Sequence, residues 1–367
     1  MNNLLSPEPI NTGRQAELDI IKGLSIMFMV LIHSFITFDP GPPQQNIPTL
    51  IILFLGSPPA APVFMIALGI GLVYSRKSAP KVLFSRGVTL FILGFVMDIF
   101  RDFLPQLWLY QITGNIDDLI LGIDWLLGID ILHFAGLTFM FFAAAVKLNF
   151  KYKHYFLAAI VFAGINLLVS NIHPQSYALR IIFGMIWGTN EFTWFPFLTW
   201  IAFPIFGYLF GQFLIRCTNK RQFYKTVLLC SFSVFSLFFV YSLLRGVDFG
   251  ELDGLSQEAY FHHDVIGNIV MVSFVYCWAG LFYFASPYIP GLINRTLSRW
   301  SKNITTFYWV HWVLLGWLRT ILHEYTPLSL PWILLLFAAI TAASDFISVY
   351  YLKIKSRVIE YKNKEKV

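Results

Sequence analysis

The sequence has 367 residues, of which 57% are hydrophobic, 18% aromatic and only 13% charged. A mean hydropathy of +0.65 over this length excludes an ordinary water-soluble protein. The three cysteines show no paired spacing, so neither a disulfide framework nor a cysteine metal site is expected.

Apolar runs of about 20 residues, each long enough to cross the roughly 30 Å hydrocarbon core of a bilayer, recur along the whole chain. We predict ten membrane-spanning helices, at roughly 18–38, 50–75, 82–101, 126–147, 154–171, 194–216, 225–245, 265–284, 303–323 and 331–352. The stretch 104–125 is too polar to span, and we expect it along the outer interface or as a re-entrant segment, which would be an eleventh. The expected fold class is an all-α integral membrane protein with one domain over 1–367 and a basic tail at 353–367.

The basic residues predict the orientation. Alternating the loops between two sides places every Lys and Arg on one side except Arg101, Arg180, Arg245 and Arg319. Lys and Arg accumulate on the cytoplasmic side, so we expect a multi-pass protein of the cell's inner (cytoplasmic) membrane with both termini inside. The net charge of +6 follows from this bias, and we expect membrane lipids rather than nucleic acid as partners.

The first predicted span carries ionisable residues near both ends. Asp19 and Lys22 open it at the inner face, where we expect them to form a packing and cap pair. His33 follows fourteen residues after Asp19, about 21 Å further along a helix. An ionisable group inside a membrane is costly, so each is a functional candidate. Histidine suits general-base chemistry because its ordinary pKa lies near working pH. The alternative is a buried histidine that only packs.

Later spans contain further ionisable residues. Asp98 and Arg101, spaced i, i+3, are expected to pair on one helix face, either to position a substrate or as a structural ion pair. Asp130 and His133 have the same spacing and are further candidates for substrate binding. Two such ligands without a third do not predict a metal site, and no metal is expected. His311 falls near mid-membrane and needs a hydrogen-bond partner or a cavity.

The second span is interrupted by the sequence GSPPAAP at 56–62. Ser57 is a candidate N-cap and Pro58 or Pro59 a first-turn residue, which predicts a helix that starts around Ala60. The N–H groups of such a start would favour an anion or an acyl oxygen. An ordinary proline kink is the alternative.

A basic cluster follows on the predicted inner side. Arg76, Lys77, Lys81 and Arg86 lie close together in the sequence and suit phosphate binding. The same cluster is also what the positive-inside rule alone would produce.

Several segments resemble one family. The segment 18–34 (LDIIKGLSIMFMVLIHS) resembles the first-span signature of the transmembrane acyltransferase superfamily, which includes the family-3 membrane acyltransferases and the heparan-α-glucosaminide N-acetyltransferase-like proteins. Lys22 stands where Arg is commoner. Further similar segments follow in the family's order, at 61–69, 86–94, 128–133, 195–207 and 303–311.

The resemblance implies an enzyme that moves an acyl group, most simply acetyl, from cytoplasmic acetyl-CoA to a hydroxyl or amine at the outer face. The implied acceptor is a glycan or a lipid-linked sugar. His33 would be the catalytic base and His311 a second active-site residue. The inner bases Arg76, Lys81 and Arg86 would hold the CoA phosphates. A homodimer stays open as a further partner.

One departure from the family pattern affects the mechanism. The heparan branch has a reactive histidine in the outer loop after its first span, whereas the corresponding loop here, 39–48 (DPGPPQQNIP), has none. Direct transfer is therefore expected rather than an acetyl-histidine in that loop. A small-solute or lipid-linked-sugar permease is the alternative function, although the inverted repeats of many such folds are not visible. A noncatalytic scaffold or sensor would leave the buried His and Asp unexplained.

Overall fold

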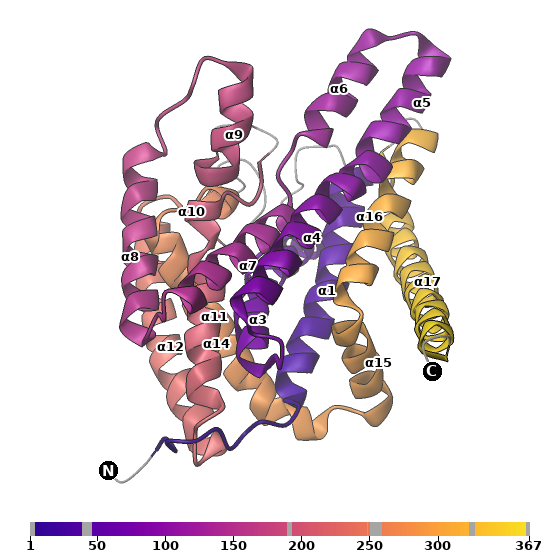
Figure 1. The fold of residues 1–367 in the computed structure, drawn as a ribbon. Coiled ribbons are helices and arrows are strands. Elements are labelled where there is room, and N and C mark those ends of the chain that lie inside the picture. The colour runs from indigo at the N-terminus through magenta and orange to yellow at the C-terminus, as the bar shows by residue number, and fades with distance from the viewer. Residues whose placement is uncertain are drawn as a thin grey trace.

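The computed structural model describes residues 4–38, 46–188, 193–247, 249, 259–322 and 327–364, and these ranges contain helices and no strand (Figure 1). Of the predicted loop 39–48, residues 39–45 lie outside the described residues. The helices are α1 (Ala16–Phe38), α2 (Ile47–Gly56), α3 (Ala61–Tyr74), α4 (Pro80–Asp98), η1 (Ile99–Phe103), α5 (Leu104–Thr113), α6 (Ile116–Leu126), α7 (Ile131–Lys147), α8 (Tyr152–Val169), α9 (Tyr177–Trp187), α10 (Phe197–Trp200), α11 (Ala202–Leu214), α12 (Lys220–Leu244), α14 (Val265–Ala285), η2 (Ser286–Tyr288), α15 (Gly291–Lys302), α16 (Ile304–Ile321) and α17 (Leu330–Lys364).

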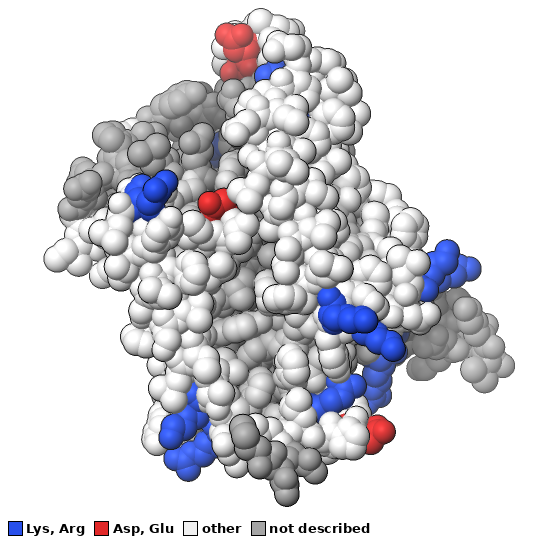
Figure 2. Space-filling view, turned by 90° about the vertical axis from the view of Figure 1, so that its left-hand side faces the viewer, with Lys and Arg blue, Asp and Glu red and all other residues white. Residues whose placement is uncertain are grey.

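The helices confirm the all-α membrane class. Among the described residues, eight helical segments are long and apolar enough to cross a bilayer. The predicted spans 126–147 and 303–323 correspond to α7 and α16, which are not among the eight; α7 has only 17 residues, and α16 carries His311 and Arg319. Ten spans and cytoplasmic termini therefore stay predictions. Figure 2 views the molecule from the left-hand side of Figure 1. On this face, Lys and Arg gather mainly in the lower half, at the end where Figure 1 places the N-terminus.

Helix α1 lies at the centre of the bundle. It contacts α2, α3, α14, α15, α16 and α17, and two apolar cores meet on it. Leu18, Ile21 and Met29 belong to the larger core, which continues into α3, α7, α11 and α14. Ile26 and Val30 belong to the smaller one, which continues into α2, α16 and α17. A helix buried on all sides holds its polar residues in a fixed environment.

The predicted pairing at the start of α1 is confirmed. The Lys22 ammonium lies 3.2 Å from the Asp19 carboxylate, which also accepts a hydrogen bond from the Ser301 hydroxyl at 2.7 Å. Asp19 additionally pairs with Arg14. These contacts join α1 to α15 at the lower end of the molecule.

The predicted interruption of the second span is confirmed, but the predicted N-cap is wrong. Helix α2 ends at Gly56 and α3 begins at Ala61. The Ser57 hydroxyl donates to the carbonyl of Leu53 at 2.7 Å. It therefore pairs with a carbonyl in the last turn of α2 rather than with an amide at the start of α3. Pro62, not Pro58 or Pro59, stands in the first turn of α3, which has no side-chain cap.

The third helical segment is longer than the predicted span 82–101, because the 104–125 stretch begins as its continuation. The interfacial or re-entrant placement of that stretch stays a prediction. Helix α4 continues through the π-helical turn η1 into α5, and α6 returns beside α5 as a hairpin that extends past the neighbouring helices (Figure 1). The π turn ends at Phe103, two residues before Pro105, whose ring nitrogen cannot donate a backbone hydrogen bond. Asn115 caps α6 by accepting from the amide of Asp117 at 3.1 Å.

Helices α3 and α11 approach closely because each has a glycine at their contact. A Cβ added at Gly69 would lie 2.0 Å from the carbonyl oxygen of Pro204, and one added at Gly207 would lie 2.1 Å from that of Ile66. Both neighbours are backbone atoms, so the helices would have to separate. At Gly71, two residues further along α3, nothing lies within 4 Å of the added atom.

We therefore expect Gly69→Ala to destabilise the protein and Gly71→Ala, in the same helix, to leave it unchanged or slightly more stable. The control gains the helix propensity of alanine, about 0.5–1 kcal/mol, without a clash. Overpacking costs about 1–3 kcal/mol. Thermal unfolding of the purified variants in detergent measures the difference, and equal midpoints would show that the close contact is absent.

Candidate active site

A small pocket lies where the interrupted helix faces α1. It has a volume of about 70 Å³, and its wall includes His33 from α1, Ala60 and Ala61 from the interruption, Asp130 before α7 and Tyr308 from α16. Residues that are distant in the sequence thus surround one cavity. His33, Asp130, Tyr260 and Tyr308 supply polar side chains to its wall.

The two predicted catalytic residues are in direct contact. His33 Nδ1 lies 2.9 Å from His311 Nε2, and the Trp312 ring stacks on His33 with 3.8 Å between ring centroids. His311 is fully buried and forms a second hydrogen bond, from Nδ1 to the carbonyl of Phe307 at 3.2 Å. The structure therefore holds both imidazoles in fixed orientations.

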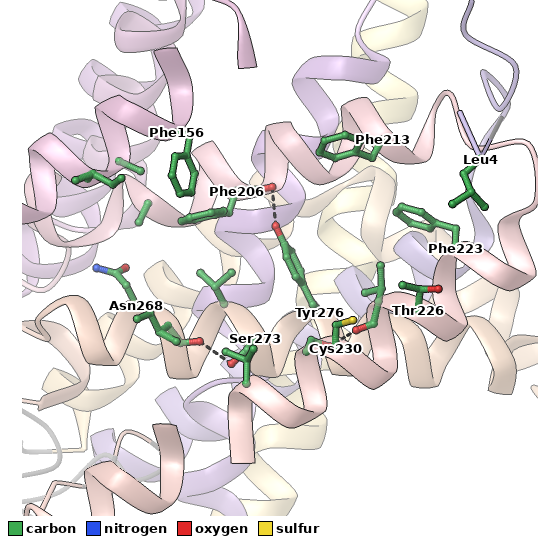
Figure 3. Close-up of a pocket in the computed structure, with 18 of the residues that line it drawn as sticks. Leu4, Phe156, Phe206, Phe213, Phe223, Thr226, Cys230, Asn268, Ser273 and Tyr276 are labelled. Carbon is green, nitrogen blue, oxygen red and sulfur yellow. Dashed lines mark hydrogen bonds between the residues drawn. The ribbon is translucent and has the colours of Figure 1, made fainter. Parts of the chain in front are cut away.

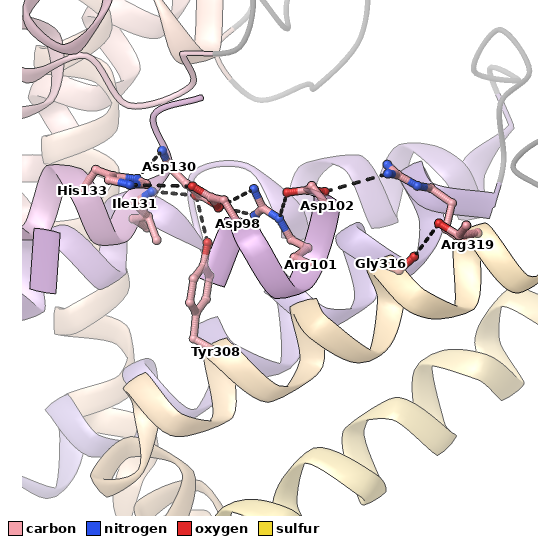
Figure 4. Close-up of polar contacts among 10 residues, drawn as sticks. Asp98, Arg101, Asp102, Asp130, Ile131, His133, Tyr308, Gly316 and Arg319 are labelled. Carbon is pink, nitrogen blue, oxygen red and sulfur yellow. Dashed lines mark hydrogen bonds and ion pairs between the residues drawn. The ribbon is translucent and has the colours of Figure 1, made fainter. Parts of the chain in front are cut away.

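The four predicted substrate-binding residues belong to one buried network centred on Arg101 (Figure 4). Its guanidinium donates to Asp98 at 2.9 Å and to Asp102 at 2.5 Å, and it also pairs with Asp130. The predicted Asp98–Arg101 pairing is confirmed. Arg101 is only 3% exposed, so these bonds form away from solvent.

The remaining contacts of the network reach α7 and α16. The Tyr308 hydroxyl donates to Asp130 at 2.8 Å. Asp130 and His133 cap α7 reciprocally, since the Asp130 carboxylate accepts from the amide of Ile131 and His133 Nδ1 accepts from the amide of Asp130. His133 Nε2 lies 3.6 Å from Asp98, and Arg319 lies 3.8 Å from Asp102 (Figure 4).

Sequence reasoning missed three members of this network, Asp102, Tyr308 and Arg319. Asp102 directly follows Arg101, so the helix periodicity that pairs Asp98 with Arg101 gave no signal for it. Tyr308 precedes His311 by three residues in the segment 303–311, and this i, i+3 spacing could have placed both on one helix face. Because Asp130 and Tyr308 also line the small pocket, the network forms part of its wall.

A second cavity, of about 450 Å³, begins one turn further along α3 than the small pocket. Lys22 and Arg86 are its charged lining residues, and its polar lining is Ser75, Ser85, Thr89, Ser301 and Thr305. The Arg86 guanidinium lies 4.7 Å from the centroid of the Phe139 ring. Arg76 and Lys81 are exposed and are not among the residues that line this cavity. Sequence reasoning assigned Lys22 only to packing, and missed its place here.

A family model described as an acyltransferase domain matches residues 15–349, nearly the whole chain. The chain belongs to the family-3 acyltransferases. No curated protein and no solved structure matched it. The family and the helical fold together identify a membrane acyltransferase, which favours an enzyme over a permease.

The two cavities of this acyltransferase approach each other at α3 and α7. Ala61 lines the small pocket and Phe64, one helical turn later, lines the larger cavity. Likewise Ile131 lines the pocket and the next residue, Leu132, lines the cavity. The separation between the two spaces is thus about one layer of side chains.

A third cavity, of about 750 Å³ and larger than the other two, lies elsewhere in the acyltransferase, among α8, α11, α12 and α14. Figure 3 shows Phe156, Phe206, Phe213 and Phe223 around it. The Tyr276 hydroxyl there donates to the carbonyl of Phe206 at 2.9 Å. Among the described residues that line it, none is charged and none is a histidine.

We expect Arg101→Gln to destabilise the acyltransferase strongly, because it leaves buried carboxylates without their main partner. Breaking a buried pair by removing one partner costs about 3–5 kcal/mol. Arg299→Gln is the control: its pair with Asp345, 2.5 Å long and partly exposed, is expected to contribute about 0–1 kcal/mol. Thermal unfolding in detergent should show a much larger drop for the first variant; similar drops would contradict the assigned role of Arg101.

Proposed function

We propose that this acyltransferase moves an acyl group from cytoplasmic acyl-CoA to a hydroxyl or amine of a glycan or lipid-linked sugar at the outer face of the inner membrane. One observation carries the proposal: a histidine-containing pocket at the start of α3 and a basic cavity that begins one turn further along the same helix approach each other. This arrangement supports entry of donor and acceptor from different sides.

The larger cavity suits the donor. The phosphates of acyl-CoA are too highly charged to enter hydrocarbon, so they need basic groups at the membrane's inner side. Arg86 and Lys22 supply positive charge, and the Ser and Thr hydroxyls supply hydrogen-bond donors. A volume of about 450 Å³ lies within the range of roughly 300–1,000 Å³ typical of ligand pockets. In this proposal the pantetheine arm extends past Phe64 and Leu132 toward His33.

The small pocket suits the reacting groups. Its volume of about 70 Å³ compares with about 30 Å³ for one water in the liquid, so it favours a short acyl group such as acetyl. Ala60 and Ala61 place the uncapped first turn of α3 at its wall. A helix N-terminus carries partial positive charge, which stabilises an oxygen that becomes negative during transfer.

In the proposed reaction His33 acts as the general base. It takes the proton of the acceptor hydroxyl or amine while the acceptor oxygen or nitrogen bonds to the acyl carbon. The carbon–sulfur bond of the thioester then breaks, and the departing thiolate takes the same proton from His33. The histidine returns to its neutral state, and no covalent acyl-enzyme is required.

We expect Arg86→Gln to raise the KM for acyl-CoA, because the variant loses a positive charge from the donor cavity. Lys81→Gln is the matched control, since it removes a nearby exposed base that does not line the cavity. Acetyl-CoA binding by calorimetry, together with transfer kinetics, measures the effect. An equal rise in both variants would point to nonspecific electrostatics, and no detectable acetyl-CoA binding by the wild type would contradict the proposal.

We expect His33→Ala to reduce acyl transfer by about 10²–10⁴-fold, the usual contribution of a general base, while acetyl-CoA binding persists. His173→Ala, which alters an exposed loop histidine, should leave transfer unchanged. The assay follows radiolabelled acetyl groups from acetyl-CoA into membrane glycan or lipid-linked sugar. Full activity of the His33 variant would exclude this histidine as the base.

A further inference from the structure

The hydrogen bonds of the two histidines determine which nitrogen of His33 can accept a proton. A neutral imidazole has one N–H donor and one nitrogen that accepts, and the environment decides which is which. For general-base chemistry, the accepting nitrogen has to face the substrate. The contacts of His311 determine which nitrogen of His33 is the acceptor.

The carbonyl of Phe307 determines which nitrogen of His311 carries the hydrogen. A carbonyl oxygen only accepts hydrogen bonds, so His311 Nδ1, 3.2 Å away, carries a hydrogen. Since neutral His311 has one N–H, its Nε2 is an acceptor. His33 Nδ1, 2.9 Å from that atom, is therefore the donor. It follows that His33 Nε2 carries a free electron pair.

We propose that His311 is a positioning residue that holds His33 in the tautomer whose Nε2 is the base; the inference rests on the proposed function. His311 touches neither donor nor acceptor in this scheme. It acts by accepting the Nδ1–H bond of His33, as a carboxylate does for the histidine of a catalytic triad.

The surroundings support a fixed dyad. His33 lines the small pocket, whereas His311 is fully buried behind it. The Trp312 ring stacks on His33 and also lies 4.8 Å from the Arg101 guanidinium, which connects the dyad to the charged network. The Tyr308 ring contacts His311 edge-on at 5.3 Å. These contacts restrict rotation of both imidazoles.

The choice of histidine has a physical reason. A carboxylate at position 311 would add a further negative charge to a site that already holds three buried carboxylates, those of Asp98, Asp102 and Asp130. A neutral imidazole accepts the same hydrogen bond without that charge, and burying an uncompensated charge is far more costly than burying a hydrogen-bonded neutral group. The dyad stays neutral until His33 takes the acceptor's proton, and it becomes neutral again when the thiolate leaves.

Two substitutions of His311 separate positioning from packing. In His311→Gln the side-chain oxygen can stand near the original Nε2 and accept the same bond, whereas His311→Leu fills similar space without an acceptor. We expect the Leu variant to lose about 10²–10⁴-fold in kcat with the KM for acetyl-CoA unchanged. The Gln variant should recover most of that loss. If Gln is as inactive as Leu while both retain the wild-type unfolding midpoint, the inference is overturned.

Nitrogen NMR of protein labelled with ¹⁵N-histidine tests the tautomer independently of activity. The signals of His33 are identified by comparison with the His33→Ala variant. We expect hydrogen on Nδ1 of His33 in the wild type and the Gln variant, and a shift toward the Nε2–H form in the Leu variant. Hydrogen on Nε2 in the wild type would overturn the inference. The expected spectra without any acyl transfer would instead refute the proposed function and leave the tautomer assignment intact.

Discussion

The buried guanidinium of Arg101 is the contact on which the arrangement of the site depends. It pairs with carboxylates of Asp98 and Asp102 on its own helical segment and with Asp130 at the start of α7. Asp130 in turn accepts from Tyr308, on the helix that carries His311. Three segments of the chain are joined by one cation. Because charge in an apolar bundle is expensive without a partner, these helices have little freedom to shift relative to one another.

The irregular parts of the backbone gather around the same place. The interruption between α2 and α3 supplies Ala60 and Ala61, and the capped start of α7 supplies Asp130 and Ile131. The π turn, Ile99–Phe103, holds Arg101 and Asp102. Irregular backbone at membrane depth is tolerated where it is buried in protein or lines a cavity. The irregularities therefore mark the site, whereas the cavity of about 750 Å³ lies among regular helices, with no charged side chain or histidine among the described residues that line it.

A division of charge follows from this arrangement. Three carboxylates and the guanidiniums of Arg101 and Arg319 neutralise most of one another within the network. Beside it, His33 and His311 form a neutral pair with a directed hydrogen bond. The basic residues Lys22 and Arg86 lie in a separate cavity. The proposed function, with a polyanionic donor and a neutral acceptor, requires that these groups be kept apart, and the two spaces are lined by neighbouring residues of α3 and α7.

Local patterns determined much of this protein from sequence alone. Apolar runs predict the membrane helices because each run must form its backbone hydrogen bonds within itself. The short-range pairs Asp98–Arg101 and Asp19–Lys22 follow from helix periodicity. The GSPPAAP interruption and the family resemblance that singles out His33 were likewise legible. Only the tertiary structure decided that His33 meets His311, 278 residues away, and that Asp130 pairs with Arg101. It also corrected the Ser57 cap and the length of the third span. The physical reason is that periodicity specifies which face of a helix is apolar or polar, but not which other helix that face will meet.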